Sequence, residues 1–276
     1  MKKRAAFSLV ELSIVLVILG LLTGGILAGQ SLIHAAELRS ITTDYNKYAT
    51  ATRAFRDKYF ALPGDMVNAT AFWGSLGGTG ADATCQAIDA TGGTATCNGD
   101  NDGSLLWGGN TTNRYEWFRF WQHLANAGLI EGSYTGTGTA GYAPGINLPA
   151  SKVTGTVFLP RNGLAYTAAG VSTMYTGSTN AFAGDYGKSV LSYTGLNPSS
   201  ATAGSWALKP EDAWNLDTKL DDGMPGTGKV MSNKGDGTNT FCSSTAGGAV
   251  ASDAGATYKF TNTAKDCGLY FIGLLP

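Results

Sequence analysis

Two acidic clusters place several carboxylates close together along this 276-residue chain. The first holds Asp100 and Asp102 in a short string of Asn, Asp and Gly, and the second holds Asp217, Asp221 and Asp222. Carboxylate and carbonyl oxygens on tight loops are the ligands that Ca²⁺ prefers. The first string lacks the length and the bidentate Glu of an EF-hand loop, and Asp and Asn are common turn formers. It is therefore a candidate calcium site, with turn formation as the alternative.

No arrangement of nucleophile, acid and base stands out in the sequence. The two histidines are His34, at the end of an apolar run, and His123, on a helix expected to face the core. Residues 223–229 fit most of the P-loop spacing, but Val230 stands where the Mg²⁺-binding hydroxyl is needed. The G-x-G-x-x-G spacing at 136–141 leads into Ala-Pro-Gly and not into a helix, so it predicts a loop. We predict that the protein is not an enzyme.

A lone carboxylate, Glu11, stands near the start of a long apolar segment. A basic leader at residues 2–4 precedes it, and the uncharged run Leu12–Ile33, 22 residues long, follows it. Such a run is long enough to cross a bilayer core of about 30 Å as a helix. A charge inside that span costs ~2.5–3.5 kcal/mol on insertion scales, so Glu11 is expected to have a partner. The alternative is a carboxylate that snorkels to the membrane edge.

The string Phe7-Ser8-Leu9-Val10-Glu11 after the basic leader resembles the N-terminus of type IV pilins and of type II secretion pseudopilins. The resemblance implies that a prepilin peptidase cuts between Ala6 and Phe7, and that Phe7 is then N-methylated. It also implies that Glu11 pairs with the new terminal amine of a neighbouring subunit, which would compensate both charges and fix the axial register. Ala6 stands where the family usually has Gly, which is also small. Ordinary signal cleavage near residues 27–30 is the alternative, and it would discard Glu11.

The charge distribution predicts how the helix is oriented. The basic leader favours an N-terminus in the cytoplasm, so the rest of the chain is expected outside it. Loss of the three leader cations changes the formal net charge from −1 to −4, before the new amine is counted. A slightly acidic chain does not suit nucleic-acid binding through a basic patch. The resemblance implies residence in the inner membrane and then in a cell-surface or periplasmic filament, with an inner-membrane assembly platform and other copies of the chain as partners.

One helix is predicted to run from Phe7 to about residue 61. Apolar residues recur at steps of 3 and 4 from Leu38 to Tyr59, and Pro63-Gly64 ends the pattern. The outer half of the helix therefore has an apolar stripe that the rest of the chain can cover. The predicted regions are a leader at 1–6, a transmembrane helix at 7–33, an amphipathic continuation at 34–62 and a β-rich globular domain at 63–276.

The remaining segment is expected to be α+β. The apolar spacing predicts a second helix at Tyr115–Ala127, with Gly128 as its C-cap. A helical spine with an antiparallel sheet gives an α+β architecture, and the resemblance implies the pilin fold, in which the sheet packs on the outer half of the long helix. Predicted strands are Lys152–Leu159, Leu164–Thr167, Ser189–Thr194, Lys229–Met231, Tyr258–Thr261 and Leu269–Leu274.

Four cysteines, Cys85, Cys97, Cys242 and Cys267, are expected to form disulfides because the domain is exported. Three connectivities are possible, and proximity in sequence favours Cys85–Cys97 and Cys242–Cys267. The second pair would resemble the C-terminal disulfide loop of pilins. A zinc site is the alternative, although no C-x-x-C pair occurs.

The second acidic cluster looks like a recurrent block of the same pilin-like proteins. Residues 217–223 read D-x-K-x-D-D-G, and some major pseudopilins bind Ca²⁺ in a comparable loop. The resemblance thus implies calcium at Asp217, Asp221 and Asp222, with helix and turn capping as the alternative. For the whole chain we predict a structural subunit of a type IV pilus-like filament. A type II secretion pseudopilin and a membrane-anchored protein that does not polymerise are the alternatives.

Overall fold

The computed structural model describes residues 9–76, 93–105, 116–137, 141–162, 182, 189–197, 202–232, 242–244 and 255–275. Its helices are α1 (Leu9–Tyr59), α2 (Ala69–Trp73), α3 (Glu116–Asn126) and α4 (Pro210–Leu220). Its strands are β1 (Thr156–Asn162), β2 (Ser189–Asn197), β3 (Thr202–Ser205), β4 (Val230–Ser232) and β5 (Leu269–Leu275).

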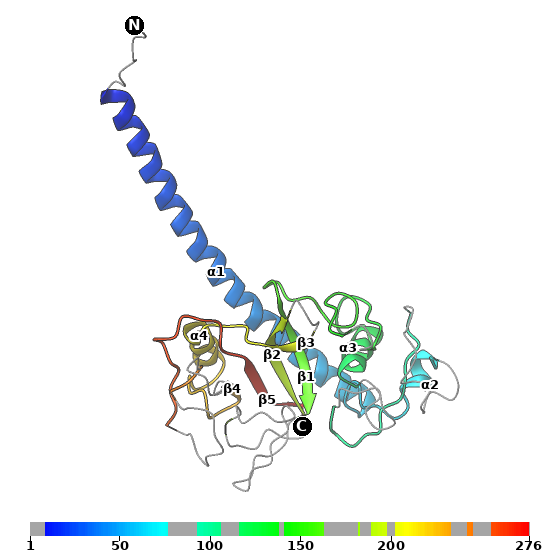
Figure 1. Cartoon of the computed structure of the whole chain (residues 1–276). Helices are drawn as coiled ribbons and strands as arrows, with labels where there is room; N and C mark the ends of the chain where they lie inside the picture. The colour runs from blue at the N-terminus through cyan, green and yellow to red at the C-terminus, as the bar shows by residue number, and fades with distance from the viewer. Residues whose placement is uncertain are drawn as a thin grey trace.

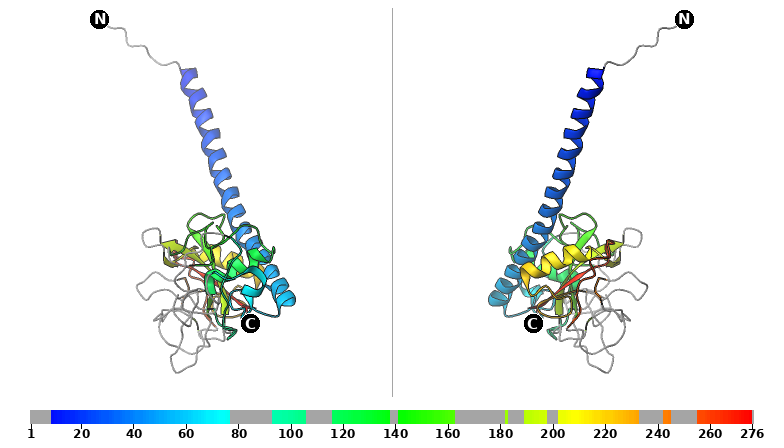
Figure 2. Two further views of the ribbon diagram at one scale, coloured as in Figure 1. Left: turned by 90° about the vertical axis from the view of Figure 1, so that its right-hand side faces the viewer. Right: turned by 90° about the vertical axis from the view of Figure 1, so that its left-hand side faces the viewer.

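Helix α1 is one unbroken helix of 51 residues, which corresponds to about 75 Å at ~1.5 Å per residue. This confirms the long helix predicted from the sequence. It ends because Phe60 takes a φ of +53° and Gly64 a φ of +89°, both outside the helical region. Its first half projects from the domain, and none of the other helices and strands that the structure describes covers it in any of the three views (Figures 1 and 2).

The outer half of α1 forms one wall of the core. Leu38, Ile41, Tyr48, Thr52 and Phe55 are buried, as their spacing predicts. Each ring on this face has an aromatic partner from the domain. The Tyr45 ring stacks on Phe271 at 4.2 Å between centroids, and Tyr48 meets Phe158 and Trp121 edge-on at 5.4 Å and 4.8 Å. The sheet and α3 therefore hold the domain on the helix by aromatic packing.

The strands form one antiparallel sheet in the order β1-β2-β5-β4. Strand β3 pairs with the C-terminal end of β2. Leu191 of β2 is in register with Phe271 of β5, and Phe271 is in turn in register with Val230 of β4. These three side chains are buried together. The fold is α+β, with a long N-terminal helix packed on an antiparallel sheet, as predicted.

Helix α3 confirms the second predicted helix, including its end. Gly128 takes a φ of +72°. Its N–H donates to the carbonyl of Ala125 at 2.9 Å, and the N–H of Leu129 donates to the carbonyl of Leu124 at 3.0 Å. These two bonds form the Schellman arrangement that a glycine after a helix favours.

The strand predictions at Ser189–Thr194, Lys229–Met231 and Leu269–Leu274 match β2, β4 and β5. The strand predicted at Tyr258–Thr261 is wrong, because a turn in which Asn262 donates to Lys259 follows a single bridge at Tyr258.

Strand β1 begins four residues after the start of the predicted Lys152–Leu159, because Val153 and Thr156 form a turn closed by a 2.7 Å bond from the Thr156 hydroxyl. The prediction at Leu164–Thr167 lies outside the described residues. Helices α2 and α4 and strand β3 were not predicted.

Candidate functional site

The free half of α1 carries the candidate assembly residue. Glu11 lies in the first turn of the helix, and the apolar side chains that follow it, from Leu12 to Ile33, are exposed. This segment is long and apolar enough to cross a membrane, and the described part of the domain buries none of its most apolar stretch. The predicted cleavage pair, Ala6 and Phe7, lies outside the described residues. A surface this apolar and this exposed requires lipid or other protein around it.

The second acidic cluster lies at the end of α4 and in the loop that follows it. Asp217, Asp221 and Asp222 each place a carboxylate oxygen within 4.8 Å of the others. Asp217 is buried and accepts hydrogen bonds from the Tyr258 hydroxyl at 2.8 Å and from the Gly223 N–H at 3.2 Å. The last turn of α4 and the loop after it therefore bring the three carboxylates together.

The other two carboxylates of this cluster organise the loop between α4 and β4. Asp221 accepts the backbone N–H groups of Lys229 and Val230, the latter at 3.0 Å. Asp222 accepts the Met224 N–H at 2.8 Å and the Thr227 hydroxyl at 2.7 Å. The segment at 223–229 that resembled a P-loop is thus a turn held by the two aspartates that precede it. Capping, the alternative to calcium, is present here.

The charge balance of the cluster leaves room for a cation. The pKa of Asp217 is raised to about 7, mainly by burial and also by the neighbouring Asp222 and Asp221 carboxylates, against the bonds from Tyr258 and Gly223 that lower it. Three carboxylates this close repel one another when ionised. Oxygen donors of this kind suit a hard divalent cation such as Ca²⁺, so the residues fit the predicted ion. Calcium at this site stays a prediction.

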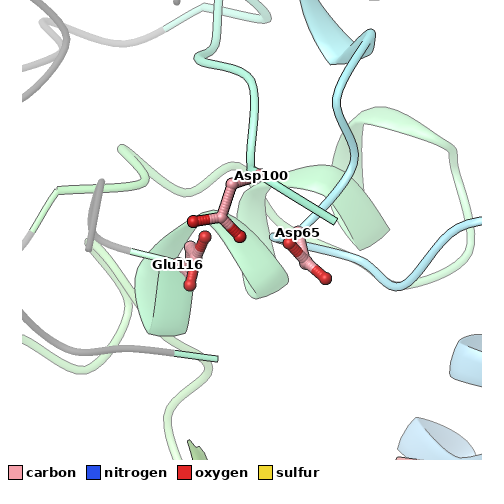
Figure 3. Close-up of side chains that lie close together, drawn as sticks. All are labelled: Asp65, Asp100 and Glu116. Atoms are coloured by element: carbon pink, nitrogen blue, oxygen red, sulfur yellow. The ribbon is translucent and has the colours of Figure 1, made fainter. Parts of the chain in front are cut away.

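The first acidic cluster differs from its prediction. Asp100 lies with Asp65 and Glu116, whose carboxylate oxygens are within 4.8 Å of each other (Figure 3). Asp102 is not in this group and accepts the Ser104 N–H at 2.6 Å, as in an ordinary Asx turn. Neither Asp65 nor Glu116 was predicted. No sequence signal could have found them, because they come from segments far from Asp100 in the chain.

Asp65 connects the end of α1 to this loop. Its carboxylate accepts the N–H groups of Asn101 at 2.5 Å and of Gly103 at 2.8 Å. Burial raises the pKa of Asp65 to about 6, and Asp100 and Asp102 contribute to the rise. The cluster therefore has a structural role: the buried Asp65 carboxylate accepts two backbone N–H groups of the loop, from Asn101 and Gly103.

The cysteines follow the predicted pattern where the structure describes them. Cys242 and Cys267 form a disulfide with 5.0 Å between their Cα atoms. Cys97 is also disulfide-bonded, and Cys85, its predicted partner, lies outside the described residues. The disulfide interpretation is thus confirmed for Cys242–Cys267, and the zinc alternative is excluded for that pair.

The two histidines lie in unlike surroundings. His123 is fully buried, as predicted for a core-facing helix, and burial together with the nearby Arg119 charge lowers its pKa to about 3. His34 is half exposed at the end of the apolar run, and its Nε2 lies 2.7 Å from Asp212 of α4. A neutral buried ring and a half-exposed ring that is hydrogen-bonded to Asp212 both have structural roles here.

Comparison with known proteins agrees with the N-terminal segment. Residues 1–27 match the family model described as the prokaryotic N-terminal methylation motif. No curated protein matches the chain, and no solved structure does. The matched segment contains Glu11 and the first part of the free apolar half of α1. The chain thus carries the N-terminal methylation motif that is the hallmark of type IV pilins and pseudopilins.

Proposed function

We propose that the protein is a structural subunit of a type IV pilus-like filament, assembled through α1 after cleavage between Ala6 and Phe7. The observation that carries the proposal is the unequal covering of one continuous helix. The domain buries the outer half, whereas the inner half presents an exposed apolar surface with Glu11 near its start. Side-by-side packing of several such halves would cover that surface.

Glu11 sets the register in this proposal. In a bundle, the terminal amine of one Phe7 and the carboxylate of a neighbour's Glu11 would compensate each other within the apolar core. Removing one member of a buried pair leaves the other charge uncompensated, which costs about 3–5 kcal/mol. The carboxylate is therefore needed for assembly, whereas insertion into the membrane is not expected to depend on it.

The test compares three full-length chains expressed in the native host: wild type, Glu11→Val and Glu11→Asp. We expect all three to reach the membrane fraction and the wild type to appear in sheared surface filaments by electron microscopy. Glu11→Val should lower the filament yield by about tenfold or more, and Glu11→Asp should retain part of it. Equal yields from wild type and Glu11→Val would contradict the register role.

Two other outcomes identify the alternatives. The methylation motif is shared with pseudopilins, so a deletion strain that loses export of a folded secreted protein but shows no surface filaments would indicate a secretion pseudopilin. A processed, membrane-bound chain with no filament and no secretion defect would indicate an anchored protein that does not polymerise. The domain, rich in Gly and with few charges, favours the surface filament.

A further inference from the structure

A cavity of about 260 Å³ lies where α1 emerges from the domain toward its free half. Its polar lining comes from three segments: His34 and Glu37 of α1, Lys209 and Asp212 at the start of α4, and Lys265 of the C-terminal segment. Figure 1 shows α4 and the orange C-terminal segment at the side of the domain from which the free half of α1 projects.

The position of the cavity along α1 places it at the level of lipid headgroups. The uncharged run ends at Ile33, and His34 is the next residue. The 22-residue run matches a bilayer core of about 30 Å, so the residues directly after it lie in the headgroup region. When the chain is anchored, lipid headgroups therefore lie at the level of His34 and Glu37 in the cavity lining.

The lining offers both signs of charge. Lys209 and Lys265 supply two exposed ammonium groups, and Glu37 and Asp212 supply two carboxylates. The Asp212 carboxylate lies 2.7 Å from Nε2 of His34, whose Nδ1 lies 3.8 Å from Glu37. A ligand that carries a phosphate and an ammonium group a few atoms apart would match this lining, the phosphate toward the lysines and the ammonium toward Glu37.

The backbone next to both lysines is held in place. Lys209 directly follows Leu208, which exchanges backbone bonds with Cys267 at 2.9 Å and 3.0 Å, and Lys265 lies two residues before that cysteine. The disulfide Cys242–Cys267 fixes the same point. The points on the backbone from which the two lysine side chains extend are thus fixed before any ligand binds, and only the flexible side chains have to be ordered on binding.

We propose that this cavity binds the headgroup of a zwitterionic phospholipid, of the phosphatidylethanolamine class, from the leaflet that faces the domain. The proposal rests on membrane anchoring through α1 and is independent of polymerisation. It gives the subunit a defined position against the membrane surface before assembly.

The test uses the full-length monomer, delipidated in detergent, and native mass spectrometry. Phosphatidylethanolamine, phosphatidylglycerol and inorganic phosphate are titrated in separate arms. We expect phosphatidylethanolamine to bind more tightly than phosphatidylglycerol. Inorganic phosphate should not displace it. Lys209→Gln with Lys265→Gln should weaken its binding by about tenfold or more, since each lysine near a phosphate surface contributes. The Lys209 side chain makes no cap bond to α4, so this variant leaves the helix start intact.

A matched control variant removes two lysine charges outside the cavity. Lys47→Gln with Lys219→Gln changes two lysines outside the cavity lining and should bind the lipid as the wild type does. Glu37→Gln should bring the two lipids to similar affinity, because it removes the partner of the ammonium group. Equal lipid binding by the cavity and control variants overturns the proposal, as does full displacement by inorganic phosphate. Either result leaves the filament proposal intact, because the monomer is measured.

Discussion

At the scale of single residues, His123 shows how a histidine can hold a core together. Its Nδ1 accepts the Gly64 N–H at 2.9 Å, and its Nε2 lies 2.9 Å from the Thr96 hydroxyl. That hydroxyl donates to the Gln122 side chain at 2.8 Å, so the ring must donate from Nε2. The ring is neutral, with both nitrogens bonded, and links the segment after α1 to α3.

The stability that His123 contributes should depend on pH. Its folded pKa of about 3 lies below the ordinary value of 6.5, so the unfolded chain binds more protons between these values. The contribution is fully present above pH 6.5 and falls as the pH falls, by up to ~1.4 kcal/mol per pH unit. We expect His123→Asn to cost about 2–3 kcal/mol at pH 7.5, with a smaller deficit at pH 5.5. Denaturant unfolding followed by tryptophan fluorescence measures this.

The control for that experiment is His34→Asn, at the half-exposed contact with Asp212, which should change the unfolding free energy by less than about 1 kcal/mol. A His123→Asn deficit that stays constant from pH 7.5 to pH 5.5 would contradict a neutral buried ring.

Calcium at Asp217, Asp221 and Asp222 is tested by thermal unfolding. An ion at 100 times its Kd adds about 2.7 kcal/mol, or several degrees of Tm for a domain of this size. We expect Ca²⁺ to raise the Tm at pH 8 relative to a chelator, and Asp222→Asn to abolish the rise. Asp100→Asn should retain it if the second cluster alone binds. An unchanged Tm in wild type would exclude a structural ion.

The same site predicts a pH dependence of opposite sign to that of His123. The pKa of Asp217, about 7, lies above its ordinary value of 3.8, so in chelator the folded state binds the extra proton. This group therefore adds stability as the pH falls from about 7 toward 4. A cation competes with that proton, so the rise in Tm from Ca²⁺ should shrink below pH 7.

At the scale of elements, Gly64 determines how closely α3 can approach the end of α1. A Cβ at Gly64 would lie 2.5 Å from the Glu116 carbonyl oxygen and 2.9 Å from the Phe120 nitrogen, both backbone atoms that cannot move alone. Gly128 also has a positive φ, but a Cβ there would meet nothing within 4 Å. A substitution at Gly128 therefore introduces only conformational strain, whereas one at Gly64 adds steric overlap with α3.

Alanine at these two positions gives the corresponding prediction. Gly128→Ala should cost about 1–2 kcal/mol, from the left-handed conformation alone. Gly64→Ala should cost about 1–3 kcal/mol more, because α3 must shift to accommodate the added carbon. Chemical unfolding of both full-length variants measures the difference. Equal costs would show that the packing of α3 on this segment is adjustable.

The elements that sequence predicted well are those with strong local signals. Periodicity and the Pro63-Gly64 stop located α1, and Gly128 located the end of α3. Helix α4 was missed although Pro210 at its start and two acidic residues in its first turn are helix-start signals. The Asp217 cluster was predicted because its members are neighbours in sequence. The partners of Asp100 were not, because only the tertiary fold brings them there.

At the scale of the whole molecule, the residues that match the family model and the residues that build the folded domain lie in different parts of the chain. The matched residues, 1–27, belong to the leader and to the half of α1 that the domain does not cover. The core that closes on the other half is built from residues of α3, α4 and the sheet. Membrane anchoring and the shape of the outer surface are thus carried by separate parts of one chain, joined through a continuous helix.

That continuous helix also determines how the molecule bears mechanical force. The buried side chains from Leu38 to Phe55 form a row parallel to the axis of α1. A pull along this axis, as in a filament under tension, would load the whole row in shear, so the contacts would share the force and resist together. A sideways pull on the domain would instead peel them apart one after another. The subunit is therefore expected to be mechanically strongest along the direction of its long helix.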